Sequence, residues 1–291
     1  MSSNLLNMAL QLSVQDIFSS SWFSSALMNK AWTDVMRSSV NGLIRNTGGS
    51  DLLGVALGGR LRGDAAMLRQ ASSNVSEAQS MMQMAAEGVG NIAGQLKEAQ
   101  KLADKFIAAT QGMDNPTDPD YIAIRDTFQA QYEAISKNID SIIRNTMYNG
   151  IALLDGSAWN GDERLSVIGN AASVRIQAGD SGFPLTFNNM IPEFSGIANQ
   201  HMLTDPGSPG PPRPEVLAEL SSLQSSAQTL ADLYSGRAGS LQSQSASLQS
   251  QSKILEEAAA QRAKTPTPVS TENILLNLIL RDSGGLFSGK G

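Results

Sequence analysis

The hydrophobic pattern is clearest in the first half of the chain, where apolar residues recur at alternating steps of three and four. This spacing keeps a narrow apolar stripe on one side of a helix, and such a stripe is buried only against another helix. The stripe therefore predicts one long helix that packs against a partner. Its positions are Val75, Ala78, Met82, Ala85, Val89, Ile92, Leu96, Ala99, Ala103 and Phe106.

A second stripe with the same spacing lies near the C-terminus and is interrupted only at Gln224, Ser245 and Ser252. Its positions are Leu217, Leu220, Ala227, Ala231, Tyr234, Ala238, Leu241, Leu248, Leu255 and Ala259. Two distant stripes that each need a partner can bury one another. We therefore predict a mainly α fold, an elongated antiparallel helical bundle or coiled-coil rod. The expected core seam is Val75, Met82, Val89, Ile92, Leu96, Phe106, Leu241, Leu248 and Leu255.

A second helix follows the first stripe after a turn at residues 112–119. Asp118 suits an N-cap and Pro119 suits the first helical position, and an apolar stripe then continues to about Asn145. From Asn149-Gly150 onward the period changes to two, in short runs around Val167, around Val174 to Ile176 and around Leu185 to Phe187. These runs predict a small β-hairpin or three-stranded element at about 160–190.

The remaining segments give the domain boundaries. Residues 1–40 read as a divergent N-terminal helix, whose Trp22 and Trp32 belong either to a buried face or to an assembly face. Residues 41–54 read as a loop, with helix resuming near Asp51 and a possible break at Gly58-Gly59. The helical core covers 41–203 and 215–262, joined by a Pro/Gly linker at 204–214. Pro266 and Pro268 end the last helix, which leaves a shortened tail at 263–291.

The last helix contains a heptad repeat, SLQSQSA followed by SLQSQSK. Such Ser/Gln sequence is also typical of disordered low-complexity segments. The in-phase leucines of the repeat, Leu241 and Leu248, with Leu255 beyond it, favour a helix.

Composition narrows the possible functions. The net charge is −6 and the pI is about 4.9, whereas nucleic-acid binding requires a basic surface. The chain has no cysteine and a single histidine, His201, and we expect no cofactor, no metal and no enzyme activity. The acidic loop at 114–120 lacks the ligand spacing of an EF-hand. The first 29 residues carry no Lys or Arg and no long apolar run, so we expect neither a cleaved secretory signal nor a membrane anchor.

Specific residues beside the first stripe resemble bacterial flagellin, most closely over 41–190 and more loosely over 217–262. The start of the family's long N-terminal helix is matched by Leu68, Gln70, Ala71, Ser72 and Asn74. The preceding loop and short helix are matched by Asn41, Gly42, Leu43, Asn46, Asp51, Gly54, Ala56 and Arg60. The end of the family's second helix is matched by Thr146, Asn149 and Gly150. The family's apolar C-terminal tail is matched by Asn273, Ile274, Leu275 and Leu278.

This resemblance implies a short, divergent flagellin without outer domains, a structural subunit that assembles helically outside the cell for motility. The implied partners are further copies or other flagellins, the flagellar type III export apparatus, a chaperone, and filament cap and junction proteins, without nucleic acid or membrane. Polar residues at matched positions are candidates for subunit contacts, or they cap and turn the chain within one subunit. They are Asn46, Asp51, Arg60, Gln70, Asn74, Asn145 and Asn149.

The chain departs from the family pattern at both ends. Glu98 and Gln100 also stand where the family usually has arginines that contact a mammalian innate receptor, so the resemblance does not extend to recognition by that receptor. The altered ends keep a second hypothesis open: an accessory protein, such as a sheath layer or hook–filament junction subunit, that binds a filament without forming its inner tube. A secreted adhesin-like module, suggested only by the linker, is a third.

Overall fold

A computed structural model of the chain describes residues 50–113, 115, 117–179, 181–194 and 214–264. These residues belong to two compact units. The first contains the described residues of Ala78–Arg175 and Pro184–Gly239, and the second contains the described residues of Val14–Glu77, Ile176–Phe183 and Ser240–Gly291. Each unit is built around long helices, and the fold is mainly α with a small β region.

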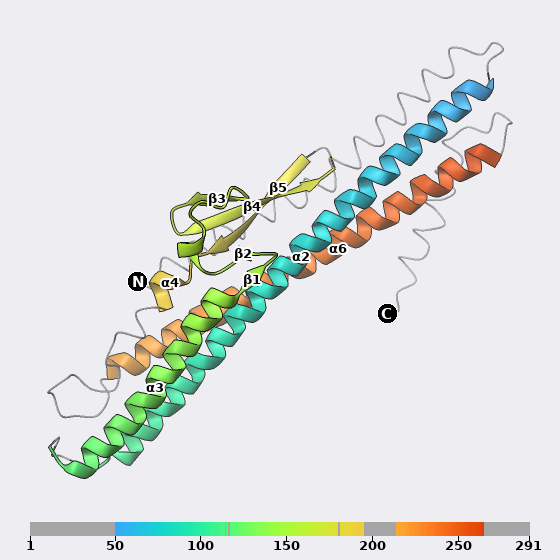
Figure 1. Ribbon diagram of the computed structural model, residues 1–291. Coiled ribbons are helices and arrows are strands. Elements are labelled where there is room, and N and C mark those ends of the chain that lie inside the picture. The colour runs from blue at the N-terminus through green and yellow to red at the C-terminus, as the bar shows by residue number, and fades with distance from the viewer. Residues whose placement is uncertain (1–49, 114, 116, 180, 195–213, 265–291) are drawn as a thin grey trace, which may run out of the picture. The chain divides into compact units, whose positions relative to one another are not determined.

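In the first unit, helix α2 (Ser50–Ala109) and helix α3 (Pro119–Asn145) form an antiparallel hairpin (Figure 1). The stripe predicted from the sequence is buried along its whole length, with Met82, Val89 and Leu96 at 0% exposure. Near the closed end of the hairpin the ring of Phe106 packs against Phe128, at a centroid distance of 5.5 Å, and against Tyr121 at 6.3 Å. Burying small and aliphatic residues, with a few rings at one end, is the packing that the sequence predicted.

The first turn of α3 follows the predicted capping chemistry. The Asp118 carboxylate accepts a hydrogen bond from the Asp120 backbone N–H at 2.9 Å, and Pro119 occupies the start of the helix. Such a cap satisfies one of the donors that a helix N-terminus leaves without a partner. The helix ends at Asn145, as predicted.

The chain then forms two antiparallel sheets. Strands β1 (Met147–Tyr148) and β2 (Ile151–Ala152) pair across Asn149 and Gly150, whose φ angles are +47° and +76°. Strands β3 (Leu165–Ile168), β4 (Ala171–Ala178) and β5 (Ser181–Asn188) form a three-stranded sheet in that order. The three longer strands confirm the period-two runs. The short β1–β2 pair was not predicted, although Asn-Gly is the strongest short hairpin signal.

The first half of helix α6 (Pro214–Lys264) belongs to the first unit, where its Leu220, Ala227 and Ala231 are buried. Its Tyr234 hydroxyl accepts a hydrogen bond from the Asn188 backbone N–H at 2.9 Å, and its ring packs against Phe187. Because that N–H is buried, the phenol supplies a partner that water cannot. The short helix α4 (Ile191–Phe194) follows β5 and contacts α3.

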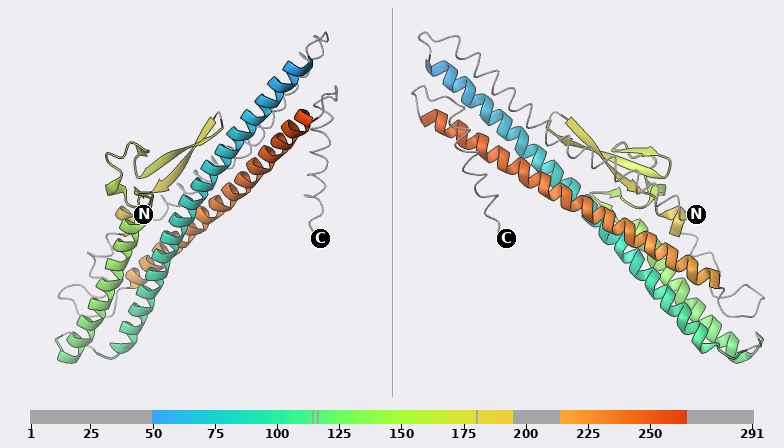
Figure 2. Two further views of the ribbon diagram at one scale, coloured as in Figure 1. Left: turned by 45° about the vertical axis from the view of Figure 1, so that its right-hand side comes forward. Right: turned by 180° about the vertical axis from the view of Figure 1, so that it is seen from behind.

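In the second unit the beginning of α2 pairs with the end of α6, antiparallel (Figure 2). Leu61 packs in a small cluster with Ala258 and Ala259, flanked by Leu255. The contacts advance along α2 as they retreat along α6, from Ala65 with Ser252 to Ser72 with Ser245. The heptad repeat is therefore helical, and Leu241 and Leu248 are buried as predicted, with Leu255 partly buried.

Helix α2 begins at Ser50, which agrees with the predicted resumption of helix near Asp51. One detail differs from the sequence prediction, because the helix continues through Gly58 and Gly59 without the possible break. Nothing lies within 4 Å of a Cβ built at either glycine, so neither marks a tight approach. The predictions for residues 1–40, for the 204–213 part of the linker and for the tail beyond Lys264 lie outside the described residues. Of the helices that are described, none is long and apolar enough to cross a membrane.

Candidate assembly contacts

The serines that interrupt the C-terminal stripe make the main polar contacts of the second unit. The Ser72 hydroxyl donates to the Ser245 carbonyl at 2.9 Å, and the Ser245 hydroxyl donates back to the Ser72 carbonyl at 3.0 Å. The Ser76 hydroxyl lies 2.7 Å from that of Ser245. One heptad along, the Ser252 hydroxyl donates to the Ala65 carbonyl at 2.8 Å. Small side chains let the two backbones approach, and each buried hydroxyl finds a partner, so the interruptions in the stripe are contact points.

Two predicted contact residues of the second unit, Gln70 and Asn74, are hydrogen-bonded to each other. The Gln70 amide donates to the Asn74 side-chain oxygen at 2.9 Å, and the Asn74 amide donates to the Gln177 carbonyl on β4 at 2.8 Å. These bonds tie α2 to the hairpin of β4 and β5 within one chain. They favour the intrasubunit interpretation for Asn74, while Gln70 is itself exposed and keeps a surface for other contacts.

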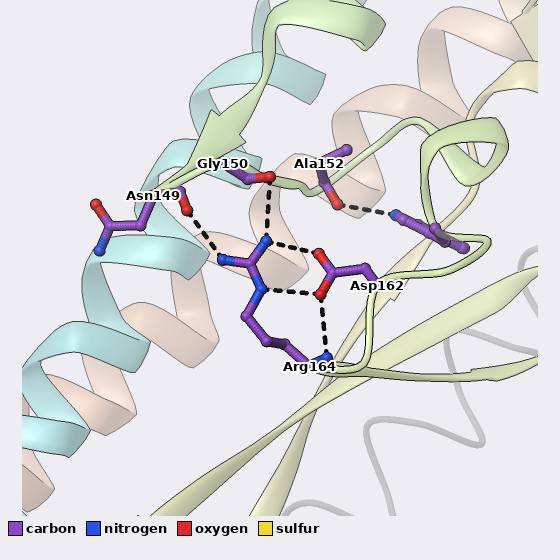
Figure 3. A network of polar contacts seen from close by, with 6 residues as sticks. Asn149, Gly150, Ala152, Asp162 and Arg164 are labelled. Carbon is purple, nitrogen blue, oxygen red and sulfur yellow. Dashed lines mark hydrogen bonds and ion pairs between the residues drawn. The ribbon is translucent and has the colours of Figure 1, made fainter.

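In the first unit, Arg164 clamps the turn between β1 and β2 (Figure 3). Its guanidinium donates to the carbonyl of Asn149 at 3.1 Å and to the carbonyl of Gly150 at 3.3 Å. Asp162 holds the guanidinium in place, accepting from Nε at 2.8 Å and from Nη2 at 2.7 Å. We name these four residues the turn clamp. A planar guanidinium can serve both the carboxylate and the carbonyls at once, which a lysine ammonium cannot.

The turn clamp sits beside a buried anchor. Trp159 is 2% exposed, and its indole N–H donates to the Ala152 carbonyl at 2.8 Å. On the other side, Thr146 donates to the Ile142 carbonyl at 2.6 Å and packs against α2 at Gly88. A Cβ at Gly88 would lie 2.6 Å from the Thr146 hydroxyl oxygen, so a larger residue there would force the neighbouring atoms to shift. The end of α3 and the first hairpin are therefore fixed to α2.

Of the other predicted site residues, some lie outside the described residues and some are exposed on helices. Asn46, Trp22 and Trp32 lie outside the described residues, and Asp51 is described only as part of the backbone of α2. Arg60 is exposed on α2. Asn145 is exposed, and its amide donates to Ser141 on the same helix at 3.0 Å. The structure thus brings Gln70 and Asn74 together in one unit, and it places Asn145 and Asn149 in the other.

Hydrogen bonding and burial shift the pKa values of side chains that hold these elements together. Hydrogen bonding to Arg164 lowers the pKa of Asp162, which keeps the turn clamp charged. Burial raises the pKa of Tyr234 to about 12, although its bond from Asn188 opposes the shift. In the described ranges, no three acidic, histidine or cysteine side chains form a group that could hold a metal ion.

Sequence reasoning missed the turn clamp and the serine contacts. Arg164 and Asp162 are two residues apart in a polar loop, a pattern shared by many surface pairs, so no sequence signal identified them. The serines did carry a signal, because Ser245 and Ser252 fall at stripe positions in register with the leucines. A polar residue in a seam position is often retained to fix helix register.

The fold is mainly α, with paired helices and a small β region that are held by polar contacts within the chain. Residues 24–158, a little under half of the chain, match the family model described as the bacterial flagellin N-terminal helical region. The chain is also 32% identical over 119 residues to a protein named flagellin from Clostridium tyrobutyricum, an alignment covering 40% of this chain and 29% of that protein. Over this part of its length the chain is similar to bacterial flagellins, and it spans under a third of the length of that relative.

Proposed function

We propose that this protein is a structural subunit of a flagellar filament, assembling helically with further copies or with other flagellins outside the cell. The observation that carries the proposal is the buried α2–α3 hairpin, which falls inside the flagellin-matched range 24–158. A contact that is made repeatedly and does not close produces a filament. Export through the flagellar type III route, a chaperone on the C-terminal region, and cap and junction proteins belong to the same proposal.

Seeded elongation tests this function. Purified full-length protein is mixed with short filament fragments, and growth is followed by negative-stain electron microscopy and by sedimentation. We expect fibres that lengthen from the seeds in proportion to the added subunit. Protein that stays monomeric with competent seeds would rule the function out.

The subunit-contact role of the polar residues is part of the proposal and has its own test. Asn74→Ala removes the bond to Gln177, and Ser73→Ala changes an exposed neighbour on the same helix as a control. An intrasubunit role predicts a lower melting temperature for Asn74→Ala, with normal elongation well below that temperature. Slower elongation at unchanged stability would instead assign Asn74 to a subunit contact. Gln70→Ala, which removes the neighbouring amide, is read in the same two assays.

The accessory alternative rests on the altered chain ends, which include Trp22 and Trp32 in the N-terminal segment and Pro266 and Pro268, which would shorten the C-terminal helix. Deleting residues 263–291 separates the two functions. Loss of all assembly supports a subunit whose ends build the filament tube, and retained binding to the surface of existing filaments supports the accessory role.

A further inference from the structure

The chain contains three Asn-Gly dipeptides, at 41–42, 149–150 and 160–161, and the last two are described. Such dipeptides deamidate in water. The glycine backbone nitrogen attacks Cγ of the asparagine, its proton passes to solvent, and ammonia leaves as a succinimide ring closes. Water then opens the ring to aspartate or isoaspartate, without oxidant or reductant. Glycine permits the attack because it has no side chain to obstruct it.

Attack requires the peptide plane between the two residues to rotate until the glycine nitrogen faces Cγ. At 149–150 this rotation is opposed on both sides. Arg164 holds the carbonyl of Asn149 and the carbonyl of Gly150, and the flanking pair Tyr148 and Ile151 is in register between β1 and β2. Rotating the plane carries the Asn149 carbonyl away from the guanidinium, so the turn clamp must open before the reaction starts.

At 160–161 the restraint is weaker. Asn160 and Gly161 are both exposed, and the turn that contains them is closed by one bond, from the Asp162 N–H to the Trp159 carbonyl at 3.3 Å. In the part of the chain that the structure describes, no side chain donates to the Asn160 carbonyl. The two dipeptides therefore share their chemistry and exposure. They differ because the Arg164 guanidinium binds both carbonyls of the first turn, which also joins paired strands, whereas beside the second dipeptide it binds only the Asp162 side chain.

We propose that Asn160 is a site of spontaneous deamidation, and that Arg164 protects Asn149 from the same reaction. Arg164 is here a positioning residue, since it acts by holding the peptide plane. Protection keeps the neutral amide and the two-residue turn at Asn149, which is a candidate contact residue, whereas isoaspartate would add a backbone atom to that turn. Only this consequence depends on the proposed function, and the chemistry itself does not.

The test follows both sites in one peptide. Full-length protein is incubated at mildly alkaline pH and digested after glutamate, which releases residues 134–163 with both asparagines and leaves position 164 outside the fragment. Tandem mass spectrometry gives the conversion at 149 and at 160. The same protein in urea supplies the ratio of the two rates for the unfolded chain.

In the folded wild type we expect the ratio of the deamidation rate at Asn149 to that at Asn160 to be lower than the same ratio measured in urea. Arg164→Ala is expected to raise the relative rate at 149 on the order of threefold to tenfold, the range that a few charge-assisted bonds of an exposed side chain can supply. Arg164→Lys should lie between the two, and Arg175→Ala, which changes an exposed arginine on β4, should match wild type. Circular dichroism confirms that each variant is folded. A wild-type ratio equal to that in urea, or a ratio that Arg164→Ala leaves unchanged, would overturn the proposal.

Discussion

The close approach of α2 to Thr146 makes Gly88→Ala a sharp test of the packing in the first unit. Replacing glycine by alanine inside a helix ordinarily stabilises the protein by up to about 1 kcal/mol. At Gly88 the new methyl would lie 2.6 Å from the Thr146 hydroxyl oxygen, 2.9 Å from its methyl carbon and 3.1 Å from Leu154. Overpacking of this kind costs about 1–3 kcal/mol.

Thr146 cannot move aside cheaply. It is buried, its hydroxyl donates to the Ile142 carbonyl at 2.6 Å, and its carbonyl accepts from the Leu153 N–H at 2.9 Å. The packing cost therefore exceeds the helical gain, and we expect Gly88→Ala to lower the free energy of unfolding by about 1–2 kcal/mol.

The assay is urea unfolding followed by far-ultraviolet circular dichroism, with Gly94→Ala as the matched control. Gly94 lies six residues further along the same helix, is exposed, and has no neighbouring atom within 4 Å of the position that an alanine Cβ would take. Its substitution should stabilise the protein by about 0.5–1 kcal/mol. In a Thr146→Ala background the cost of Gly88→Ala should shrink, because the clashing atoms are gone. Equal effects of the Gly88 and Gly94 substitutions would show that Thr146 does not obstruct a methyl group at position 88.

Three further predictions concern other parts of the core. Phe106→Ala should cost about 3–5 kcal/mol of unfolding free energy, because a fully buried ring leaves a cavity beside Phe128, and a loss below 1 kcal/mol would contradict that packing. Tyr234 has a folded pKa of about 12 against an ordinary value of 10, so its contribution to stability is complete below pH 10 and is lost as pH rises to 12. Tyr234 should contribute a fall in the free energy of unfolding of roughly 1.4 kcal/mol per pH unit over this range, and Tyr234→Phe should remove that contribution. Ser245→Ala should cost about 1 kcal/mol in thermal or urea unfolding, with a smaller loss for the exposed neighbour Ser247, whose truncation serves as the control.

Much of the helical fold could be predicted because burial in paired helices imposes a period that the sequence must carry. The stripe from Val75 to Phe106 is buried throughout, and Asp118 with Pro119 fixed the start of α3 to the residue. Period-two runs located β3, β4 and β5 for the same reason. Where apolar burial decides the structure, the pattern was sufficient.

The contacts that hold these elements together were harder to foresee, because they depend on which polar groups meet in space. Arg164 reaches a turn that lies 14 residues away in the sequence, and nothing local in the chain indicates that reach. Gly58 and Gly59 illustrate the converse, since two glycines predicted a possible break and the helix continues through them. Local propensity is a weak signal that tertiary packing overrides.

The proposal that this chain builds a flagellar filament from its paired helices can be tested by a helical reconstruction of filaments grown from the purified protein. We expect subunit density containing the α2–α3 hairpin, with Phe106 against Phe128 and Trp159 buried beside β2, repeated along the filament wall. Density for this chain found only on the outer surface of a filament made of another protein would contradict the claim.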